Sequence, residues 1–220
     1  MNNGDSPMSS RSISRIGSRC SSSVNTSRER IDASPGCCNW RDCDTVRRSK
    51  RGLDKSQLLR LATGDWIQLH GVLLIAGPTS TGKSWLACAL GHSACRHGYL
   101  VRYLSFLLLL PELAIARNGG TYSKVLAQLG KVDLLILDDW GLAPIGDRER
   151  RDLVEMIEDL TGRRATLLTS QVPVEHWHEG VGDATFGDAI MDRLVHHAHR
   201  ITLTGGSLRK LGAGAATDPV

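Results

Sequence analysis

The segment from Gly77 to Ser84 constrains the fold of this 220-residue chain more than any other. It satisfies the pattern G-x-x-x-x-G-K-[ST] of a phosphate-binding P-loop. The apolar residues 72–76 before it predict a short strand, and residues 83–97 after it predict a helix that ends at Gly98. Because this pattern binds phosphates when it joins a strand to a helix, we interpret it as functional rather than as an ordinary glycine-rich turn.

Each part of the loop has a physical role in this prediction. The glycines allow backbone N–H groups to converge on phosphate oxygens, and the helix N-terminus adds a partial positive charge. We expect Lys83 to reach the β- and γ-phosphates of ATP and Ser84 to ligate Mg²⁺. The predicted nucleotide-binding residues are Gly77, Pro78, Thr79, Ser80, Thr81, Gly82, Lys83 and Ser84.

A pair of acidic residues forms the second predicted part of the site. Residues 134–137 are Leu-Leu-Ile-Leu, and Asp138 and Asp139 follow them directly. A buried strand that ends in carboxylates presents them at the carboxyl edge of the sheet, where open α/β folds bind ligands. We expect Asp138 to hold Mg²⁺ through water and Asp139 to orient or deprotonate an attacking water. The alternative for Asp139 is that it only caps the next turn.

A polar segment after another apolar strand supplies the third part. Residues 165–168 predict a strand, and Thr169, Ser170 and Gln171 follow it. If this strand lies between the other two, one of these side chains can hydrogen-bond the γ-phosphate or the water, and we choose Gln171. The alternative is that Ser and Thr form only a turn.

The rest of the pattern alternates between short apolar and longer amphipathic segments. We expect strands at residues 72–76, 100–104, 133–138, 165–169 and 200–203. We expect helices at residues 83–97, 112–117, 121–128, 147–160 and 187–198, and one that Asp54 caps and Gly64 ends. This alternation predicts an α/β fold, a parallel sheet with helices on both faces, and no separate lid domain is evident.

The net charge of +4 is unevenly distributed along the chain. Residues 1–52 hold ten Lys or Arg against five Asp or Glu, whereas the remainder holds 17 against 18. Residues 1–50 are rich in Ser and Arg without apolar periodicity, so we expect a basic, largely disordered segment. It could contact phosphate backbones or remain a solvated arm. We expect the ATPase domain at residues 51–210 and a flexible tail at 211–220.

Composition argues against several other classes of protein. No apolar run approaches the roughly 20 residues of a membrane span, and no secretory leader is recognisable, so we expect a cytoplasmic protein without membrane contact. The six cysteines lack C-x-x-C spacing, which argues against zinc and disulfides. The histidines near His176 and His196 have no Cys or carboxylate pattern beside them that would complete a metal site.

Several segments beyond the P-loop resemble one family. They are residues 86–92, residues 132–141 with Pro144, residues 169–171, and residues 192–197. With them, residues 52–210 resemble the IstB-like transposition helper ATPases, relatives of the helicase loader DnaC within the AAA+ group of P-loop NTPases. The segment Asp-Arg-Leu-Val-His-His at 192–197 is the most discriminating, because a generic P-loop protein has no reason to carry it.

The resemblance implies an ATPase that uses ATP and Mg²⁺ and acts as a homo-oligomer with shared nucleotide sites. Arg193 matches the arginine finger that AAA+ subunits insert into a neighbour's site, where it offsets charge on the γ-phosphate. Arg209 matches a family position near the nucleotide or the subunit boundary. Double-stranded DNA and a transposase are the implied partners, and the helical insertion with Arg117 and Lys124 is where initiator-type relatives commonly touch DNA. A solvated helix face is the alternative for each of these two basic residues.

Two other functions remain as alternatives. A helicase loader of the DnaC type would act through protein contacts on a replicative helicase. A small-molecule kinase is disfavoured, because those enzymes generally need an arginine-rich lid and no such segment follows Asp138. Family members usually begin with a compact helical region that engages partners, whereas residues 1–48 show no such pattern, which weakens the expectation of transposase binding and assembly.

Overall fold

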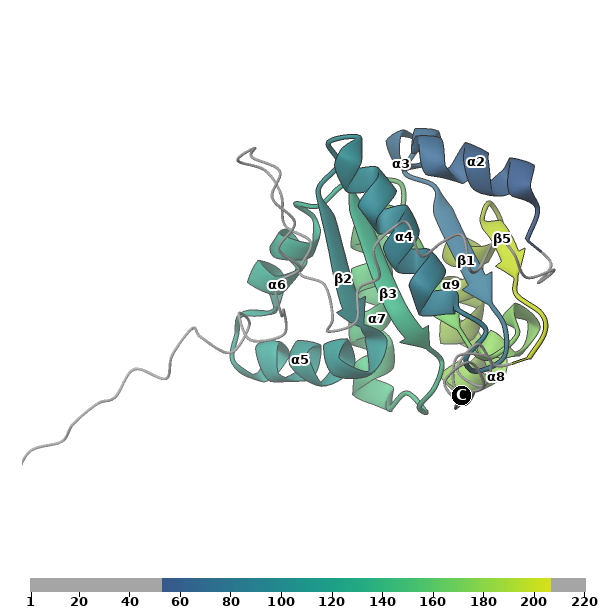
Figure 1. Cartoon of the computed structure of the whole chain (residues 1–220). Helices are drawn as coiled ribbons and strands as arrows, with labels where there is room; N and C mark the ends of the chain where they lie inside the picture. The colour runs from purple at the N-terminus through teal and green to yellow at the C-terminus, as the bar shows by residue number, and fades with distance from the viewer. Residues whose placement is uncertain (1–52, 207–220) are drawn as a thin grey trace, which may run out of the picture.

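The computed structural model describes residues 53–206. The predictions for residues 1–50, for residues 211–220 and for Arg209 lie outside these described residues. Within the described part, the strands form a 5-stranded sheet in the order β2-β3-β4-β1-β5, and each neighbouring pair is parallel (Figure 1). The strands are β1 (Val72–Ala76), β2 (Val101–Ser105), β3 (Leu134–Trp140), β4 (Ala165–Ser170) and β5 (His199–Thr202). The predicted parallel α/β fold is therefore confirmed.

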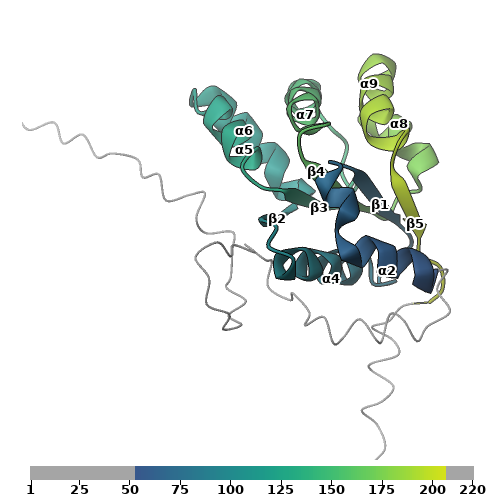
Figure 2. The same cartoon turned by 90° about the horizontal axis from the view of Figure 1, so that it is seen from above.

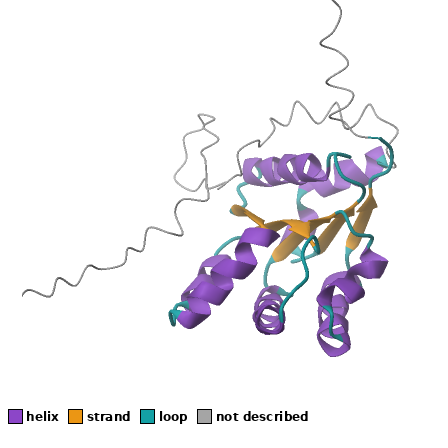
Figure 3. Cartoon of the chain, turned by 90° about the horizontal axis from the view of Figure 1, so that it is seen from below, coloured by secondary structure: helices purple, strands orange, loops and turns teal. Residues whose placement is uncertain are grey.

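Helices cover both faces of this sheet, as Figures 2 and 3 show. One face carries α2 (Lys55–Thr63), α3 (Asp65–Gln68) and α4 (Lys83–Arg96). The other carries α5 (Phe106–Asn118), α6 (Tyr122–Leu129), α7 (Asp147–Leu160), the short 3-10 helix η2 (Val174–His176), α8 (Trp177–Val181) and α9 (Ala184–Val195). None of the helices within residues 53–206 is long and apolar enough to cross a membrane.

Strand β1 is apolar at every position because helices cover both faces of the sheet there. In β1, Leu73 and Ile75 pack toward α4, whereas Leu74 and Ala76 belong to the core on the opposite face. Successive side chains of a strand point to opposite faces, so a strand covered on both sides favours apolar residues at successive positions. This explains why β1 and the first four residues of β3 were visible in the sequence as continuous apolar runs.

Capping residues and helical periodicity explain why the bounds of some helices match the prediction most closely. Asp54 caps α2 by accepting a hydrogen bond of 2.9 Å from the Ser56 amide, and Gly64 ends it in the left-handed conformation. Helix α7 has the predicted bounds, and its buried apolar residues, at 153, 156, 157 and 160, recur with helical periodicity and share one face.

Helix α5 begins six residues earlier than we predicted, at Phe106. Pro111 lies inside it and lacks the N–H that an interior helical position donates, which made the sequence look like a helix boundary. Phe106, Leu109 and Leu110 are buried on the sheet, and their packing outweighs the lost hydrogen bond. Helices α3, η2 and α8 were not predicted, because segments of three to five residues carry little periodic signal.

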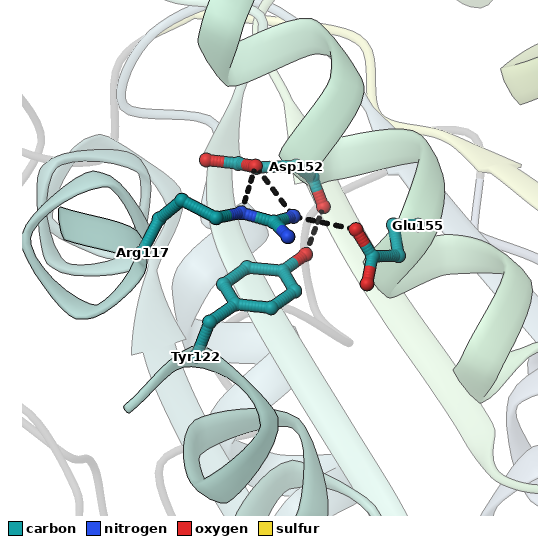
Figure 4. A network of polar contacts seen from close by, with 4 residues as sticks. All are labelled: Arg117, Tyr122, Asp152 and Glu155. Atoms are coloured by element: carbon teal, nitrogen blue, oxygen red, sulfur yellow. Dashed lines mark hydrogen bonds and ion pairs between the residues drawn. The ribbon is translucent and has the colours of Figure 1, made fainter. Parts of the chain in front are cut away.

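A network of polar contacts holds α5 and α6 against α7 (Figure 4). The Arg117 guanidinium donates to Asp152 Oδ1 at 2.8 Å and to Glu155 Oε2 at 2.5 Å, and its carbon lies 3.5 Å from the centre of the Tyr122 ring. The Tyr122 hydroxyl donates to the Asp152 carbonyl at 2.7 Å. Arg117 is therefore engaged within its own chain, whereas Lys124 of α6 is exposed.

Candidate nucleotide-binding site

The loop between β1 and α4 is anchored at Gly77. Its amide donates to the Ser170 carbonyl of β4 at 3.1 Å. A Cβ atom at this position would lie 2.5 Å from the Leu203 carbonyl oxygen, closer than such atoms approach. The backbone after β5 therefore packs directly on the start of the loop, which requires glycine there.

Lys83 lies at the start of α4 with 6% of its surface exposed. Its amine donates to the Gly77 carbonyl at 2.8 Å and to the Pro78 carbonyl at 2.9 Å. Burial lowers the pKa of Lys83, and the charges of Asp139 and Asp138 oppose that shift. The loop thus holds a buried cation above two neutral carbonyl groups, an arrangement suited to a negatively charged ligand.

The amides of the loop supply a second sign of fit to phosphate. Among the described residues, the N–H groups of residues 79–84 donate to no backbone carbonyl. Gly82 precedes α4 in the left-handed conformation, with φ of 97°, and Ser80 also has positive φ. Unpaired amides at a helix N-terminus match the acceptor oxygens of phosphate, so residues 77–84 fit the predicted ligand.

Asp138 at the end of β3 accepts hydrogen bonds from hydroxyl groups of three other elements. Ser84 of α4 donates to Oδ1 at 3.0 Å, Thr169 of β4 also donates to Oδ1, and Tyr103 of β2 donates to Oδ2. The predicted pair of Ser84 and Asp138 is therefore in direct contact. Their hard oxygen atoms are the donors that Mg²⁺ prefers, so these residues fit the predicted metal.

An irregularity in β3 sets the position of Asp139. Leu137 pairs with Leu168 and Trp140 with Ser170, so residues 138 and 139 lie opposite Thr169 alone. Asp139 is in the left-handed conformation with φ of 64°, and its amide donates to the Thr169 hydroxyl at 3.2 Å. This bulge brings both carboxylates to the carboxyl edge beside the loop.

The electrostatic surroundings of Asp139 suit a group that handles protons. Burial and the negative charge of Asp138 raise the pKa of Asp139. A hydrogen bond from Gln171 and the charge of Lys83 act in the opposite direction. Asp139 therefore departs from an ordinary surface aspartate, as expected for a candidate general base.

Gln171 lies directly beside the loop, as the order of the strands requires. Strand β4 pairs with both β1 and β3, so the segment after it is placed between the loop and the acidic pair. The Thr79 hydroxyl donates to Gln171 Oε1 at 2.5 Å. Gln171 thus contacts both the P-loop and Asp139.

Two residues that contact Asp138 were not among the predicted site residues. Thr169 belongs to the predicted polar segment, but Gln171 was chosen there instead. Tyr103 lies in the middle of β2, next to Leu104, where its ring is indistinguishable from a core residue in sequence. Its hydroxyl is buried, and burial together with the charge of Asp138 raises its pKa strongly, so Tyr103 stays protonated at neutral pH.

Within a single chain, Arg193 lies away from the P-loop and the acidic pair. It lies in the last turn of α9, where it donates to Glu158 of α7 at 2.6 Å and to the Ala189 carbonyl at 2.9 Å. Its side chain remains 32% exposed. The chain brings together the P-loop, Asp138, Asp139 and Gln171, and it holds Arg193 in an ion pair elsewhere.

A cleft of about 320 Å³ has both apolar and polar side chains in its walls, His176 and Glu179 among them. Its walls include Trp140 and Gly141, which directly follow Asp139, and Val172, which directly follows Gln171. Trp140 and Trp177 are almost fully buried, with ring centres 5.4 Å apart. These tryptophans therefore pack in the core and do not offer exposed rings to nucleic-acid bases.

The strand order, the P-loop and the acidic pair define a P-loop NTPase domain of the AAA+ type. The fold is similar to that of the helicase loader DnaC, with a TM-score of 0.60 and 16% identity over 68% of this chain and 87% of that one. It is also similar to DnaI, with a TM-score of 0.58, 19% identity, and coverage of 74% and 94%. The replication initiator DnaA bound to AMPPCP and single-stranded DNA is also similar, with a TM-score of 0.58 and 20% identity over 73% of this chain and 50% of that one.

The chain belongs to the family of IstB-like ATP binding proteins, whose model matches residues 41–214. It is 54% identical over 167 residues to the insertion sequence ATP-binding protein y4pL of Sinorhizobium fredii (strain NBRC 101917 / NGR234), covering 76% of this chain and 68% of that one. A second protein of that strain, y4uH, is 51% identical over 168 residues with the same coverage. The family resemblance seen in the sequence is confirmed.

Proposed function

We propose that this protein is an ATP-dependent helper of DNA transposition, which binds MgATP, assembles on double-stranded DNA and recruits or stimulates a transposase. The observation that carries the proposal is the convergence of Lys83, Ser84 and Asp138 at one edge of the sheet. Family membership supports the biological role, since the similar proteins are ATP-binding proteins of insertion sequences. We further propose that residues 51–210 are the ATPase domain and that the protein acts in the cytoplasm.

Nucleotide binding is the first step of the proposed cycle. Lys83 exchanges its two carbonyl partners for the β- and γ-phosphates, and the amides of residues 79–84 donate to phosphate oxygens. Ser84 and Asp138 would hold Mg²⁺, which would supply neutralising charge to the phosphates. Exchange of carbonyl groups for phosphate favours binding, because a buried ammonium gains opposite charge.

Hydrolysis requires groups that orient and activate water. Asp139 orients or deprotonates the water, and its raised pKa makes it a better base than an ordinary aspartate. Gln171 links the loop to Asp139 and senses the γ-phosphate. Arg193 of a neighbouring subunit completes the site after release from Glu158, a half-exposed ion pair that costs at most about 1 kcal/mol to break.

DNA contact in the proposal depends on charge rather than base recognition. Lys124 of α6 is exposed, and the segment before residue 53 is basic. Such contacts go to phosphates, which position a protein on DNA without reading its sequence. Several subunits on one duplex then add affinity while target choice remains broad.

A helicase loader is the second candidate function. The fold likeness to DnaC and DnaI favours it, although identities of 16% and 19% establish the fold alone. The transposition helper is preferred because the 54% identical relative is an insertion sequence protein. The two functions differ in their partners: a helper needs DNA and a transposase, and a loader needs a replicative helicase.

Fluorescence anisotropy on unrelated duplexes tests the proposal. We expect binding with ATP, weaker binding with ADP or no nucleotide, and little difference between duplex sequences. If each subunit makes two phosphate contacts, log affinity falls with log salt at a slope of roughly minus two per bound subunit. Lys83→Ala is the matched control and should lose the ATP-dependent part. Absence of DNA binding in every nucleotide state contradicts the helper function and leaves the loader as the better account.

A further inference from the structure

Tyr103 contacts Asp138 in a way that the nucleotide-binding function does not explain. Of the three hydroxyl groups on the Asp138 carboxylate, those of Ser84 and Thr169 reach Oδ1, and that of Tyr103 reaches Oδ2. Ser84 has a proposed role as a metal ligand, and the Thr169 hydroxyl also accepts a hydrogen bond from the Asp139 amide. The Tyr103 hydroxyl also interacts with the Ser84 side chain, so it touches both residues of the proposed metal site.

The surroundings of Tyr103 would accept a phenylalanine as readily. Its ring lies in the apolar core between the sheet and α4, with Leu86, Val101 and Ile136 in the same cluster. Burying a hydroxyl group there is costly unless it is hydrogen-bonded, and Asp138 is its partner. The hydroxyl group, rather than the ring, is the feature that needs a function.

The geometry of the contact supplies that function. A tyrosine hydroxyl beside an ionised carboxylate acts as a donor, so it occupies Oδ2 and fixes the plane of the Asp138 carboxyl group. The other oxygen, Oδ1, is thereby kept on the side of Ser84. Removing a group that orients a metal ligand by a hydrogen bond typically lowers metal affinity by roughly 10- to 100-fold.

We propose that Tyr103 is a positioning residue for Mg²⁺, which fixes the Asp138 carboxylate so that Oδ1 faces Ser84. This inference rests on the proposed function, because it requires that the site bind ATP with Mg²⁺. Tyr103 acts through Asp138 and does not contact the phosphates. Its removal therefore weakens the response to Mg²⁺ and leaves the metal-free affinity for nucleotide unchanged.

The test compares Tyr103→Phe with Tyr122→Phe, which removes the hydroxyl of a buried tyrosine on the opposite face of the sheet. Affinity for a fluorescent ATP analogue is measured in EDTA and across a Mg²⁺ titration, with thermal unfolding as a check on folding. We expect the half-saturating Mg²⁺ concentration to rise roughly tenfold in Tyr103→Phe. Affinity in EDTA should match the wild type, and Tyr122→Phe should match it in both conditions.

A double variant isolates the path through Asp138. Adding Tyr103→Phe to Asp138→Asn should leave the Mg²⁺ response of Asp138→Asn unchanged, because the carboxylate that Tyr103 orients is already gone. This comparison also tests the inference if the single variant Tyr103→Phe fails to fold because Asp138 loses a hydrogen-bond partner.

Two results overturn the inference while leaving the proposed function intact. One is an unchanged Mg²⁺ response in Tyr103→Phe, and the other is an equal loss of nucleotide affinity with and without Mg²⁺, which indicates a packing role. Failure of the wild-type protein to bind nucleotide in either condition contradicts the proposed function itself and the inference with it.

Discussion

The hydroxyl of Ser84 lies 3.0 Å from Oδ1 of Asp138, although 54 residues separate them in the sequence. This contact joins the P-loop to the acidic pair across β4, the strand that lies between β1 and β3. It places the two predicted metal ligands side by side. Nucleotide and metal would therefore enter a site whose carboxylate is already oriented by neighbouring hydroxyl groups.

Asp139→Asn should bind ATP and assemble but fail to turn over. The amide cannot accept a proton from water, whereas Asn tolerates the left-handed conformation of this position better than Ala does. Nucleotide binding and phosphate release, measured on the same sample, separate the two steps. Asp139→Ala is the less suitable variant, because it adds backbone strain. Normal phosphate release by Asp139→Asn would show that Asp139 only caps the turn.

The same variant has a predictable effect on stability. Because the pKa of Asp139 is raised in the folded chain, its ionised form destabilises the fold above that pKa. Asp139→Asn should therefore unfold at a higher temperature than the wild type at pH 7. The difference should vanish below about pH 4, near the ordinary pKa of aspartate, where the group is protonated in both states. Thermal unfolding across this range checks the sign, and a variant less stable than wild type at pH 7 contradicts it.

Arg193→Ala should retain ATP binding and lose turnover together with nucleotide-dependent assembly. The matched control is Glu158→Gln, which weakens the same ion pair but leaves the arginine in place. If Arg193 acts on a neighbouring subunit, Glu158→Gln should hydrolyse ATP at least as fast as wild type, because the finger is easier to release. ATPase assays over a range of protein concentrations, with light scattering for assembly, make the comparison. Equal loss of turnover in both variants would assign Arg193 a structural role instead.

Arg117 and Lys124 should behave differently, although both lie in the α5–α6 insertion. Arg117→Met leaves Asp152, which is 6% exposed, without its cation, so the free energy of unfolding should fall by about 1–3 kcal/mol. Lys124→Ala should change stability by no more than about 0.5 kcal/mol but reduce the salt slope of DNA binding by about one. Urea unfolding and anisotropy on the two variants test this, and the opposite pattern would make Arg117 the DNA contact.

The sequence predicted the framework of the site because its elements carry strong local signals. The apolar runs before Gly77 and Asp138 are typical of buried strands, and their carboxyl ends meet at one edge of a parallel sheet. The segment with Gln171 was placed correctly because a strand between the two motifs was assumed, and β4 occupies that position. Here local pattern and overall topology agree.

The parts that the sequence could not predict depend on contacts between distant residues. Tyr103 looks like a core residue of β2 until the fold sets its hydroxyl against Asp138, 35 positions away. The bulge at Asp139 is a backbone feature without a glycine to mark it. Pro111 indicated a helix boundary, and only the burial of Phe106 on the sheet shows why α5 continues through it.

The central claim is that Lys83 and the loop around it bind MgATP, and a titration of Lys83→Ala with a fluorescent ATP analogue tests it most directly. Lys124→Ala, which removes an exposed lysine, is the control, and thermal unfolding verifies that both variants fold. We expect wild type and Lys124→Ala to bind MgATP equally, whereas Lys83→Ala should bind it far more weakly and release no phosphate. Unchanged MgATP affinity in folded Lys83→Ala would contradict the account.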